Sequence, residues 1–287
     1  VRATAPAVVV GLDCITGLQT ARILARRGVP VIGVARDPRH FACRTRACTR
    51  VVAADPEGPG LLDALERLAA ELPEPGVLVP CSDGAVLALS RGRERMLPHY
   101  RLVLPDADVV EVMIDKVRFL ELAQRIGLPI PRTWLIRDRA GAREAAAQLA
   151  YPAVVKPPMK SPAWQRATRA KAFKGNDAGE LLAIHERYSP FAEVLIAQEW
   201  IEGGESELYS CNCYYGREGR PLVTFVARKL RQWPPETGTS SLGEEVRNDA
   251  VLAATLQLFD AVGYRGLGYV EIKRDVRSGR QLVIEPN

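Results

Sequence analysis

Apolar runs and amphipathic stretches alternate along the first third of the chain. Short apolar runs at residues 7–12, 29–35, 76–83 and 102–105 predict buried strands. Amphipathic stretches at 18–27 and 61–71 predict helices, because their apolar positions recur with the helical period. A strand–helix–strand order with short turns is typical of an open parallel sheet. We therefore expect an α/β fold in this part of the chain.

The turn after the first strand contains Gly11 and Gly17. A dinucleotide site would need G-x-G-x-x-G spacing and an acidic residue after the second strand, where Ala35 and Arg36 stand instead. The pattern favours a tight turn near a ligand cleft. Ser82 and the aspartate after it stand at the carboxyl end of the third strand. They could line that cleft, or they could cap the next helix.

The hydropathy pattern changes after a predicted helix at 109–126 and a proline-rich connector at 127–133. Strands follow at 151–156, 191–197, 206–215 and 221–230, with helices at 177–187 and 249–262 and irregular loops at 159–174 and 233–241. This mixture indicates α+β lobes. We expect three domains: an N-terminal open parallel-sheet α/β domain at 1–112, and two α+β lobes at 113–196 and 197–287.

Composition narrows the class of protein. Apolar residues make up 47% and charged residues 25%, as in ordinary globular proteins, and the net charge is +5. Basic residues cluster at 36–50 and 156–174, which favours local anionic ligands such as phosphate over nucleic acid. The six cysteines lack zinc-like spacing, and no apolar run resembles a signal peptide or a membrane span. We expect a cytoplasmic protein without membrane or nucleic-acid partners.

The last twenty residues predict a hairpin that turns at Ser278 and Gly279. If the hairpin is symmetric about this turn, Glu271 lies opposite Glu285, and Asn287 shares a face with Glu285. Two opposed carboxylates destabilise a strand pair, and a divalent cation would remove that penalty. Two carboxylates and an amide suit magnesium; the alternative is a plain hairpin with exposed charges.

Several cations stand where they could meet phosphate. Lys156 ends an apolar strand directly before Pro157, so it points from a sheet edge toward a ligand such as phosphate. The basic segment 159–174 is either a loop that closes over phosphates or a solvated loop. Arg228, Lys229 and Arg231 follow one another on a strand, and alternation places Lys229 and Arg231 on one face; the alternative is that they decorate an exposed strand.

Taken in order, these motifs resemble those of the ATP-grasp superfamily, in its carboxylate–amine ligase branch, similar to D-aspartate ligase and biotin carboxylase. The resemblance covers nearly the whole chain. It rests on six segments: 115–116, 154–157, 198–205, 227–231, 270–271 and 284–287. It implies a pre-ATP-grasp domain followed by two ATP-grasp lobes, and it implies that the second lobe continues beyond Asn287.

The resemblance also implies a role for each matching residue. Lys116 and Lys156 would contact ATP phosphates, with Lys171 as a further candidate. Glu199, Trp200 and Ile201 would form the hinge that contacts adenine. Glu205 would accept hydrogen bonds from the ribose hydroxyls. The metal ligands would be Glu271, Glu285 and Asn287, which would hold two Mg²⁺ ions, or Mn²⁺ in their place, against the phosphates of ATP. Stabilisation of the transferred phosphoryl group would fall to Lys229 or to a neighbouring arginine, Arg228 or Arg231.

The chain departs from the family pattern at three places. Residues 160–171 lack the glycines of the usual phosphate loop, Tyr269 stands where an arginine often precedes the first metal carboxylate, and the arginine that often follows Glu-x-Asn lies past Asn287. The first departure means that contacts of the basic loop are not carried over. The other two shift acyl-phosphate stabilisation toward Arg228 and Arg231.

The expected activity is that of an ADP-forming carbon–nitrogen ligase. A carboxylate would attack ATP to give an acyl phosphate, and an amine would then form an amide or peptide bond. Both substrates are expected to be small and amino-acid-like, and a homodimer is compatible with this function. The alternatives are a carboxylase or carbamoyl-phosphate-type enzyme that uses bicarbonate, and a non-catalytic nucleotide-binding protein.

Overall fold

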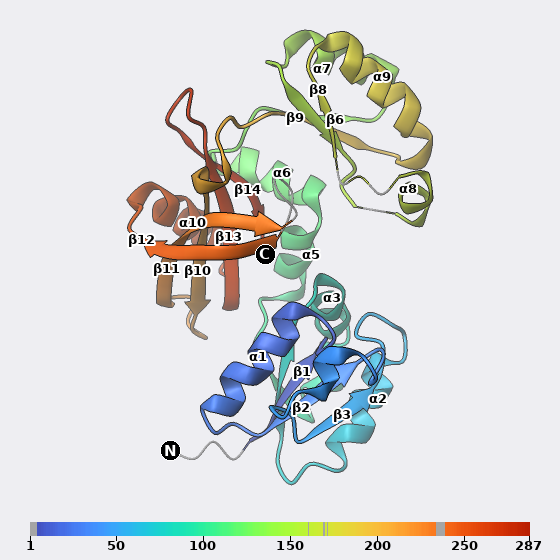
Figure 1. Ribbon diagram of the computed structural model, residues 1–287, viewed down its shortest axis with the longest axis vertical. Coiled ribbons are helices and arrows are strands. Elements are labelled where there is room, and N and C mark those ends of the chain that lie inside the picture. Colours follow the sequence, from blue (N-terminus) through green and yellow to red (C-terminus); the bar gives the residue numbers. More distant parts are fainter. Residues whose placement is uncertain (1–4, 160, 169, 171, 234–238) are drawn as a thin grey trace. The chain divides into compact units, whose positions relative to one another are not determined.

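The computed structural model describes residues 5–159, 161–168, 170, 172–233 and 239–287. By its internal contacts the chain divides into two compact units, Val1–Glu111 and Val112–Asn287 (Figure 1). The first unit holds a parallel sheet and the second holds antiparallel sheets, as the sequence pattern predicts.

Over its described residues, the first unit forms a parallel sheet in the order β3-β2-β1-β4-β5. Its elements are β1 (Ala7–Val10), α1 (Ile15–Arg26), β2 (Val31–Ala35), η1 (Phe41–Arg44), β3 (Arg50–Ala53), α2 (Leu61–Ala69), β4 (Gly76–Pro80), α3 (Asp83–Arg91), α4 (Arg93–Met96), β5 (Tyr100–Leu102) and α5 (Ala107–Ile114). The hydropathy pattern does not predict β3, because this edge strand has only two apolar residues at its centre.

Both faces of this sheet are covered, which explains the continuous apolar runs. Val8 and Val10 pack against apolar residues of α2 and α3, while Val9 points to the opposite face, toward Ala21 of α1. The first turn is tight: a Cβ at Gly17 would lie 2.1 Å from the carbonyl oxygen of Gly11. The glycines therefore serve close packing of helix on strand, as the missing dinucleotide spacing indicates.

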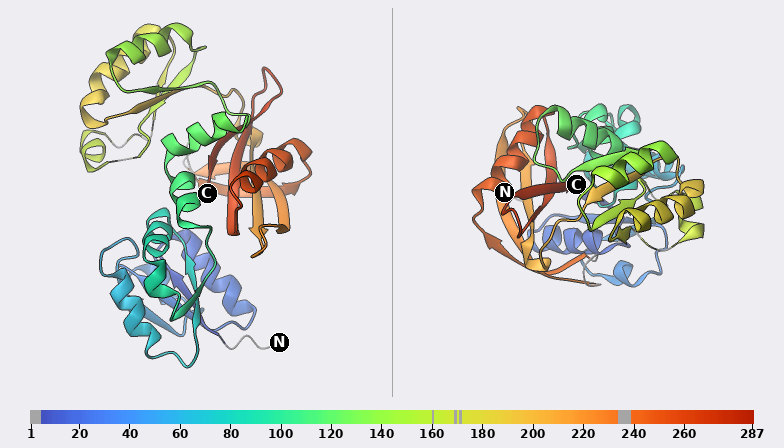
Figure 2. Two further views of the ribbon diagram at one scale, coloured as in Figure 1. Left: turned by 180° about the vertical axis from the view of Figure 1, so that it is seen from behind. Right: turned by 90° about the horizontal axis from the view of Figure 1, so that it is seen from above.

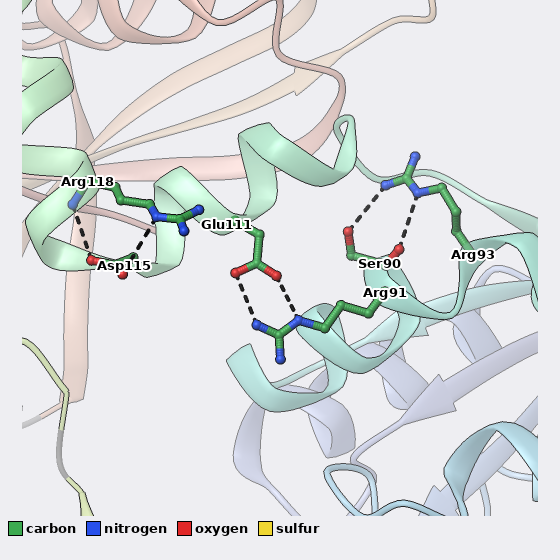
Figure 3. A network of polar contacts seen from close by, with 6 residues as sticks. All are labelled: Ser90, Arg91, Arg93, Glu111, Asp115 and Arg118. Carbon is green, nitrogen blue, oxygen red and sulfur yellow. Dashed lines mark hydrogen bonds and ion pairs between the residues drawn. The ribbon is translucent and has the colours of Figure 1, made fainter.

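Ser82 caps the helix that follows β4. Its hydroxyl accepts a hydrogen bond from the backbone N–H of Ala85, at 3.3 Å, and α3 begins one residue later. Of the two roles left open for Ser82, the structure shows the capping role. Further along, the guanidinium of Arg91 donates to both carboxylate oxygens of Glu111, at 2.7 and 3.1 Å, and so ties α3 to α5 within the first unit (Figure 3).

The single helix predicted at 109–126 is wrong, because Asp115 breaks it. α5 ends at Ile114, and α6 (Lys116–Arg125) begins after Asp115. A carboxylate oxygen of Asp115 accepts from the backbone N–H of Val117 at 2.8 Å. It also accepts from the backbone N–H of Arg118 at 3.2 Å (Figure 3). An aspartate in this position starts a new helix, which places Lys116 in the first turn of α6.

The described part of the second unit contains two antiparallel sheets, in the orders β6-β9-β7-β8 and β12-β11-β10-β13-β14 (Figure 2). After α6 its elements are β6 (Thr133–Ile136), α7 (Arg139–Gln148), β7 (Ala153–Lys156), α8 (Pro162–Ala167), β8 (Phe173–Gly175), α9 (Ala178–Tyr188), η2 (Ser189–Phe191), β9 (Leu195–Glu199), η3 (Glu205–Glu207), β10 (Leu208–Tyr215), β11 (Pro221–Trp233), β12 (Thr239–Val246), α10 (Asp249–Ala261), β13 (Gly266–Arg274) and β14 (Gln281–Pro286). The expected lobe boundary between residues 196 and 197 falls inside β9.

The basic segment after β7 is not the irregular loop that its sequence predicts. It contains α8, whose Trp164 is fully buried beside Phe173 and Tyr188, with ring centroids 5.9 and 5.4 Å away. The indole N–H of Trp164 donates to the carbonyl oxygen of Ala170. One buried aromatic outweighs the polar character of its neighbours, so this stretch is anchored to the core of the four-stranded sheet. Lys160, Arg169 and Lys171 lie outside the described residues.

In the second unit, α10 covers one face of the five-stranded sheet β12-β11-β10-β13-β14. Cys211, Cys213 and Tyr215 point to this face from β10, and Phe259 of α10 meets Tyr215 edge to face. The two cysteines are buried free thiols, as expected. Alternation turns Ser210 and Asn212 to the other face, which also carries Glu271 of β13. The strand β12 corrects the loop expected at 233–241, of which 234–238 lie outside the described residues.

Within the described ranges, every helix falls short of the length and apolar character needed to cross a bilayer.

Candidate nucleotide and metal site

The closing hairpin has the predicted register. Glu271 on β13 is the cross-strand partner of Glu285 on β14, and Gly279 turns the chain with a φ of +72°. The hairpin consists of β13 and β14 (Figure 1). Asn287 lies opposite Tyr269, and their backbone groups exchange two hydrogen bonds of 2.7 and 2.8 Å. A bulge follows Glu271, so the register shifts between this residue and the turn. The predicted donors Glu271, Glu285 and Asn287 therefore gather at one end of the hairpin.

Each of the two carboxylates is paired with a lysine. Lys229 Nζ lies 2.9 Å from Glu271 Oε1, and Lys116 Nζ lies 3.5 Å from Glu285 Oε2. The Lys229–Glu271 pair is the more buried, with side chains 13% and 23% exposed. The repulsion expected between opposed carboxylates is thus offset by two cations, one from β11 and one from α6.

The donor chemistry of this end of the hairpin fits magnesium. Two carboxylates and one amide are hard oxygen donors, and magnesium typically takes one or two carboxylates together with phosphate oxygens and water. Among the described residues no group of three or more His, Cys, Asp or Glu side chains is suited to a metal ion. Phosphate oxygens would therefore have to complete the coordination, which is how magnesium is held in nucleotide sites.

Lys156 ends β7 and is held by a neutral partner. Its Nζ donates to Gln198 Oε1 at 3.2 Å, and Gln198 Nε2 donates to Thr133 Oγ1 at 2.9 Å. Burial lowers the pKa of Lys156; Glu285 acts in the opposite direction, and Lys116 adds to the lowering. These effects place Lys116, Lys156 and Glu285 within electrostatic reach of one another, as expected of groups that share one phosphate-binding site.

Residues at the turn of the same hairpin form hydrogen bonds with the predicted hinge, Glu199–Ile201, and with the residue after it. Arg277 donates to the carbonyl oxygen of Trp200 at 3.0 Å, and the N–H of Val276 donates to that of Glu202 at 3.1 Å. The ammonium groups of Lys174 and Lys273 lie 4.6 and 5.3 Å from the centre of the Trp200 ring. The Glu199 side chain accepts from the backbone N–H of Ala150, so it contributes to the local structure.

Glu205 is connected to the metal end of the site through β11. Its carboxylate accepts from the backbone N–H of Gln232 at 3.0 Å, and the Gln232 side chain accepts from Lys229 Nζ at 3.3 Å. Gln232 is only 6% exposed. The predicted ribose acceptor and the predicted catalytic cation thus share one buried glutamine.

The three predicted catalytic cations have different surroundings. Lys229 lies at Glu271, whereas Arg228 forms an ion pair with Glu244 on β12. Arg231 is exposed, and the register of β11 and β12 shifts on both sides of it, so simple alternation does not describe its place. Lys171, the further phosphate candidate, lies outside the described residues. The structure thus brings Lys229 together with Lys116, Glu271 and Glu285.

Motif reading misses three polar side chains that organise this site: Thr133, Gln198 and Gln232. Gln198 opens the segment 198–205, which contributes to the family resemblance, but it has no predicted role because an uncharged side chain carries no obvious chemistry. A usable signal existed for it: a glutamine at the end of the apolar run 195–197 breaks a buried strand pattern. Buried polar groups need partners, so such a residue predicts a specific contact.

No family model matches the chain. Solved structures share its fold at low sequence identity. The biotin carboxylase domain of 2-oxoglutarate carboxylase from Hydrogenobacter thermophilus, in complex with MgADP, ADP and bicarbonate, matches with a TM-score of 0.70 and 16% identity, over 100% of this chain and 64% of that one. L-amino acid ligase from Bacillus licheniformis matches with a TM-score of 0.68 and 17% identity, over 100% of this chain and 67% of that one. The fold of this chain is therefore the one that these two structures share.

Two curated proteins are similar to this chain in sequence. D-aspartate ligase from Enterococcus faecium (strain Aus0004) is 22% identical over 223 residues, which cover 74% of this chain and 52% of the relative. D-alanine–D-alanine ligase from Stutzerimonas stutzeri (strain A1501) is 23% identical over 181 residues, covering 61% and 54%. The chain spans about half the length of these two proteins. The predicted resemblance to the ATP-grasp carboxylate–amine ligases is confirmed by these matches, and they support a ligase.

Proposed function

We propose that this chain carries the nucleotide and phosphoryl-transfer site of an ATP-dependent carboxylate–amine ligase. The observation that carries the proposal is the register pair Glu271–Glu285, with Lys229 against one carboxylate and Lys116 against the other. Two opposed carboxylates with two lysines form a site that alternates negative and positive charge. Such a site suits a polyphosphate that arrives with its own divalent cations.

In this proposal ATP lies between the hinge and the hairpin. Backbone groups of Glu199–Ile201 bind the edge of adenine, Glu205 accepts from the ribose hydroxyls, and Lys116 and Lys156 bind phosphate oxygens. Glu271, Glu285 and Asn287 would hold one or two magnesium ions, with manganese as a substitute. Bound there, magnesium would neutralise charge on the phosphates.

The reaction follows from these positions. An oxygen of the substrate carboxylate attacks the γ-phosphorus, the bond to the β,γ-bridging oxygen breaks, and ADP leaves with its electron pair. An amine nitrogen then attacks the acyl carbon, and inorganic phosphate and a proton are released. Lys229, the most buried of the three candidate cations at this end, would meet the γ-phosphate; positioning and charge neutralisation are the main protein contributions to such transfers.

The two substrates are proposed to be small and amino-acid-like. This rests on the relatives, whose names specify D-aspartate and D-alanine, and on the L-amino acid ligase with the same fold. About half the length of those relatives has no counterpart in this chain, so the residues that select their substrates need not belong to the matched part.

Positional isotope exchange in ATP tests the proposed route. With the correct acid and no amine, oxygen in the β,γ-bridge should scramble, because acyl-phosphate formation is reversible. Candidate amino acids are offered singly and then in pairs while ADP is measured. If ADP formed only with bicarbonate, and no amino acid increased its rate, the ligase proposal would be replaced by the carboxylase alternative. Nucleotide binding without ADP release under any condition would favour a non-catalytic binding protein.

A further inference from the structure

Three side chains on adjacent strands form a hydrogen-bonded chain that ends on Lys156. Thr133 on β6 donates its hydroxyl proton to the carbonyl oxygen of Pro131, at 2.8 Å. The same hydroxyl oxygen accepts from Gln198 Nε2 at 2.9 Å, and Gln198 Oε1 accepts from Lys156 Nζ at 3.2 Å. None of these links belongs to the backbone pairing of the sheet.

The direction of every link is set by chemistry. A hydroxyl has a single proton, and the proton of Thr133 is already given to a carbonyl, which can only accept. Thr133 can therefore only accept from Gln198. The amide must then turn its NH₂ toward Thr133 and its oxygen toward Lys156, whose ammonium group can only donate. The orientation of the Gln198 amide is thus determined by a hydroxyl on the opposite side from the lysine.

Reversing this amide would be costly. Its NH₂ would face an ammonium group, and its oxygen would face a hydroxyl with no proton left to donate. Gln198 is 5% exposed, so water has little access to compensate for a lost partner. A buried polar group without a partner is destabilising. The chain therefore favours one orientation of Gln198 and one place for Lys156 Nζ.

The backbone register supports the same arrangement. Thr133 and Val154 both lie opposite Gln198, on β6 and β7, with β9 between them. Lys156 is two residues beyond Val154, so it shares a face with it and is diagonal to Gln198. The intervening Val155 and Ala197 point into the core on the other face. Three strands thus deliver the three side chains to one face of the sheet.

A neutral acceptor suits a lysine that must bind phosphate. Gln198 occupies one of the three N–H donors of Lys156 and leaves its positive charge uncompensated. A carboxylate at this place would also locate the ammonium group, but it would compete with the phosphate for it. The charged groups that face Lys156 are Glu285, which favours its charged form, and Lys116, which disfavours it.

We propose that Thr133 and Gln198 are positioning residues that hold Lys156 Nζ at the phosphates of the bound nucleotide. This inference rests on the proposed function, which assigns Lys156 to phosphate. In this proposal Thr133 acts on the lysine through the amide of Gln198.

The test compares a ligand that has phosphates with one that lacks them. Binding of ATP is measured directly, and binding of adenosine by competition at millimolar concentration, for Thr133→Val, Thr133→Ser, Gln198→Glu and Lys156→Met. Thr133→Val should raise the Kd for ATP about fivefold, the typical effect of one hydrogen bond, and leave the Kd for adenosine unchanged. Thr133→Ser keeps the hydroxyl and should bind ATP within about twofold of the wild type, on the same scale.

Gln198→Glu should weaken the binding of ATP more than Thr133→Val does, because the glutamate is an anion that competes with phosphate for Lys156. Equal weakening of ATP and adenosine by Thr133→Val would overturn the inference, since it would indicate a general change in the fold or the hinge. Lys156→Met distinguishes failure of the positioning role of Thr133 and Gln198 from failure of the phosphate role of Lys156. If it changes ATP binding while Thr133→Val does not, only the positioning role fails. If it leaves ATP binding unchanged, the phosphate role of Lys156 in the proposed function fails as well. Melting temperatures of all four variants identify any that are misfolded.

Discussion

Glu271 and Glu285 face each other across one rung of the closing hairpin, and each is paired with a lysine that belongs to a different element. Without Lys229 and Lys116 this rung would place two like charges side by side, which destabilises a strand pair. The same four charges carry the proposed function: in it, magnesium would meet the carboxylates and phosphate oxygens would meet the lysines.

Glu285→Gln should therefore abolish turnover and weaken binding of magnesium–ATP. The change removes one anionic metal ligand and keeps the shape of the side chain. We expect at least a hundredfold loss in the rate of phosphate release, in line with the loss of a metal-dependent step. Phosphate release and ATP affinity are measured together. Glu218→Gln is the matched control, because Glu218 is an exposed glutamate that forms a surface ion pair with Arg220. Phosphate release from Glu285→Gln at the wild-type rate would contradict the metal assignment.

Lys229 and Arg228 are adjacent in sequence but should differ in their effects. Lys229→Met removes the cation that faces Glu271 and should reduce turnover strongly, whereas Arg228→Met breaks an ion pair with Glu244 at the edge of the sheet and should cost much less. Mn²⁺ binding without nucleotide gives a second readout. Lys229→Met should bind Mn²⁺ more tightly than the wild type, because Glu271 no longer has a competing ammonium partner. Weaker Mn²⁺ binding would mean that Lys229 supports the metal ligands instead of competing with the metal.

The pairing of Glu271 with Glu285 in the closing hairpin could be predicted from sequence because its information is local. Gly279 adopts a left-handed backbone at the turn, and an equal count of residues each way from Ser278 pairs Glu271 with Glu285, as the structure does. The bulge beside Glu271 is the part of the register that this count does not contain. The parallel sheet of the first unit could likewise be predicted, because strands buried on both faces have unbroken apolar runs.

Other features depend on contacts that a linear pattern does not contain. Trp164 lies in a basic, polar segment, yet it belongs to the helix Pro162–Ala167 and packs against Phe173 and Tyr188. Asp115 divides a continuous amphipathic pattern because its carboxylate satisfies two N–H groups at a new helix start. The orientation of the Gln198 amide is set by Thr133, which is 65 residues away in sequence. The first and third of these outcomes follow from a tertiary partner, whereas the Asp115 cap is local and overrides an unbroken apolar pattern.

ATP, and not a nicotinamide dinucleotide, should bind to this protein. Lys156, the hinge and Glu205 lie in the second unit, while the first βα turn of the first unit uses its glycines for helix packing. The melting temperature is measured with magnesium–ATP and, separately, with NAD. Saturating ATP at about 100 times its Kd should stabilise the protein by about 2.7 kcal/mol. Stabilisation by NAD alone would show that the first unit holds the ligand site.

Trp164→Ala should destabilise the second unit. The indole is fully buried and hydrogen-bonded to the carbonyl of Ala170, so its removal leaves a cavity and an unpaired acceptor. Replacement of a buried tryptophan by alanine typically costs about 3–5 kcal/mol. Denaturant unfolding measures the loss, and Trp233→Ala is the control, because that side chain is 76% exposed. Equal stability of the two variants would show that α8 is not anchored as described.

Arg277 should influence nucleotide binding although it lies at the far end of the hairpin from Glu271. Its guanidinium donates to the carbonyl oxygen of Trp200, and it also pairs with Asp275, which fixes the turn. Arg277→Ala should loosen the hinge and raise the KM for ATP by about five- to tenfold, the effect of a lost charged hydrogen bond, while kcat changes little. Arg280→Ala, an exposed arginine in the same turn, is the control. A selective fall in kcat with an unchanged KM would place the effect of Arg277 on the metal end of the hairpin, and would show that the clasp on Trp200 does not position adenine.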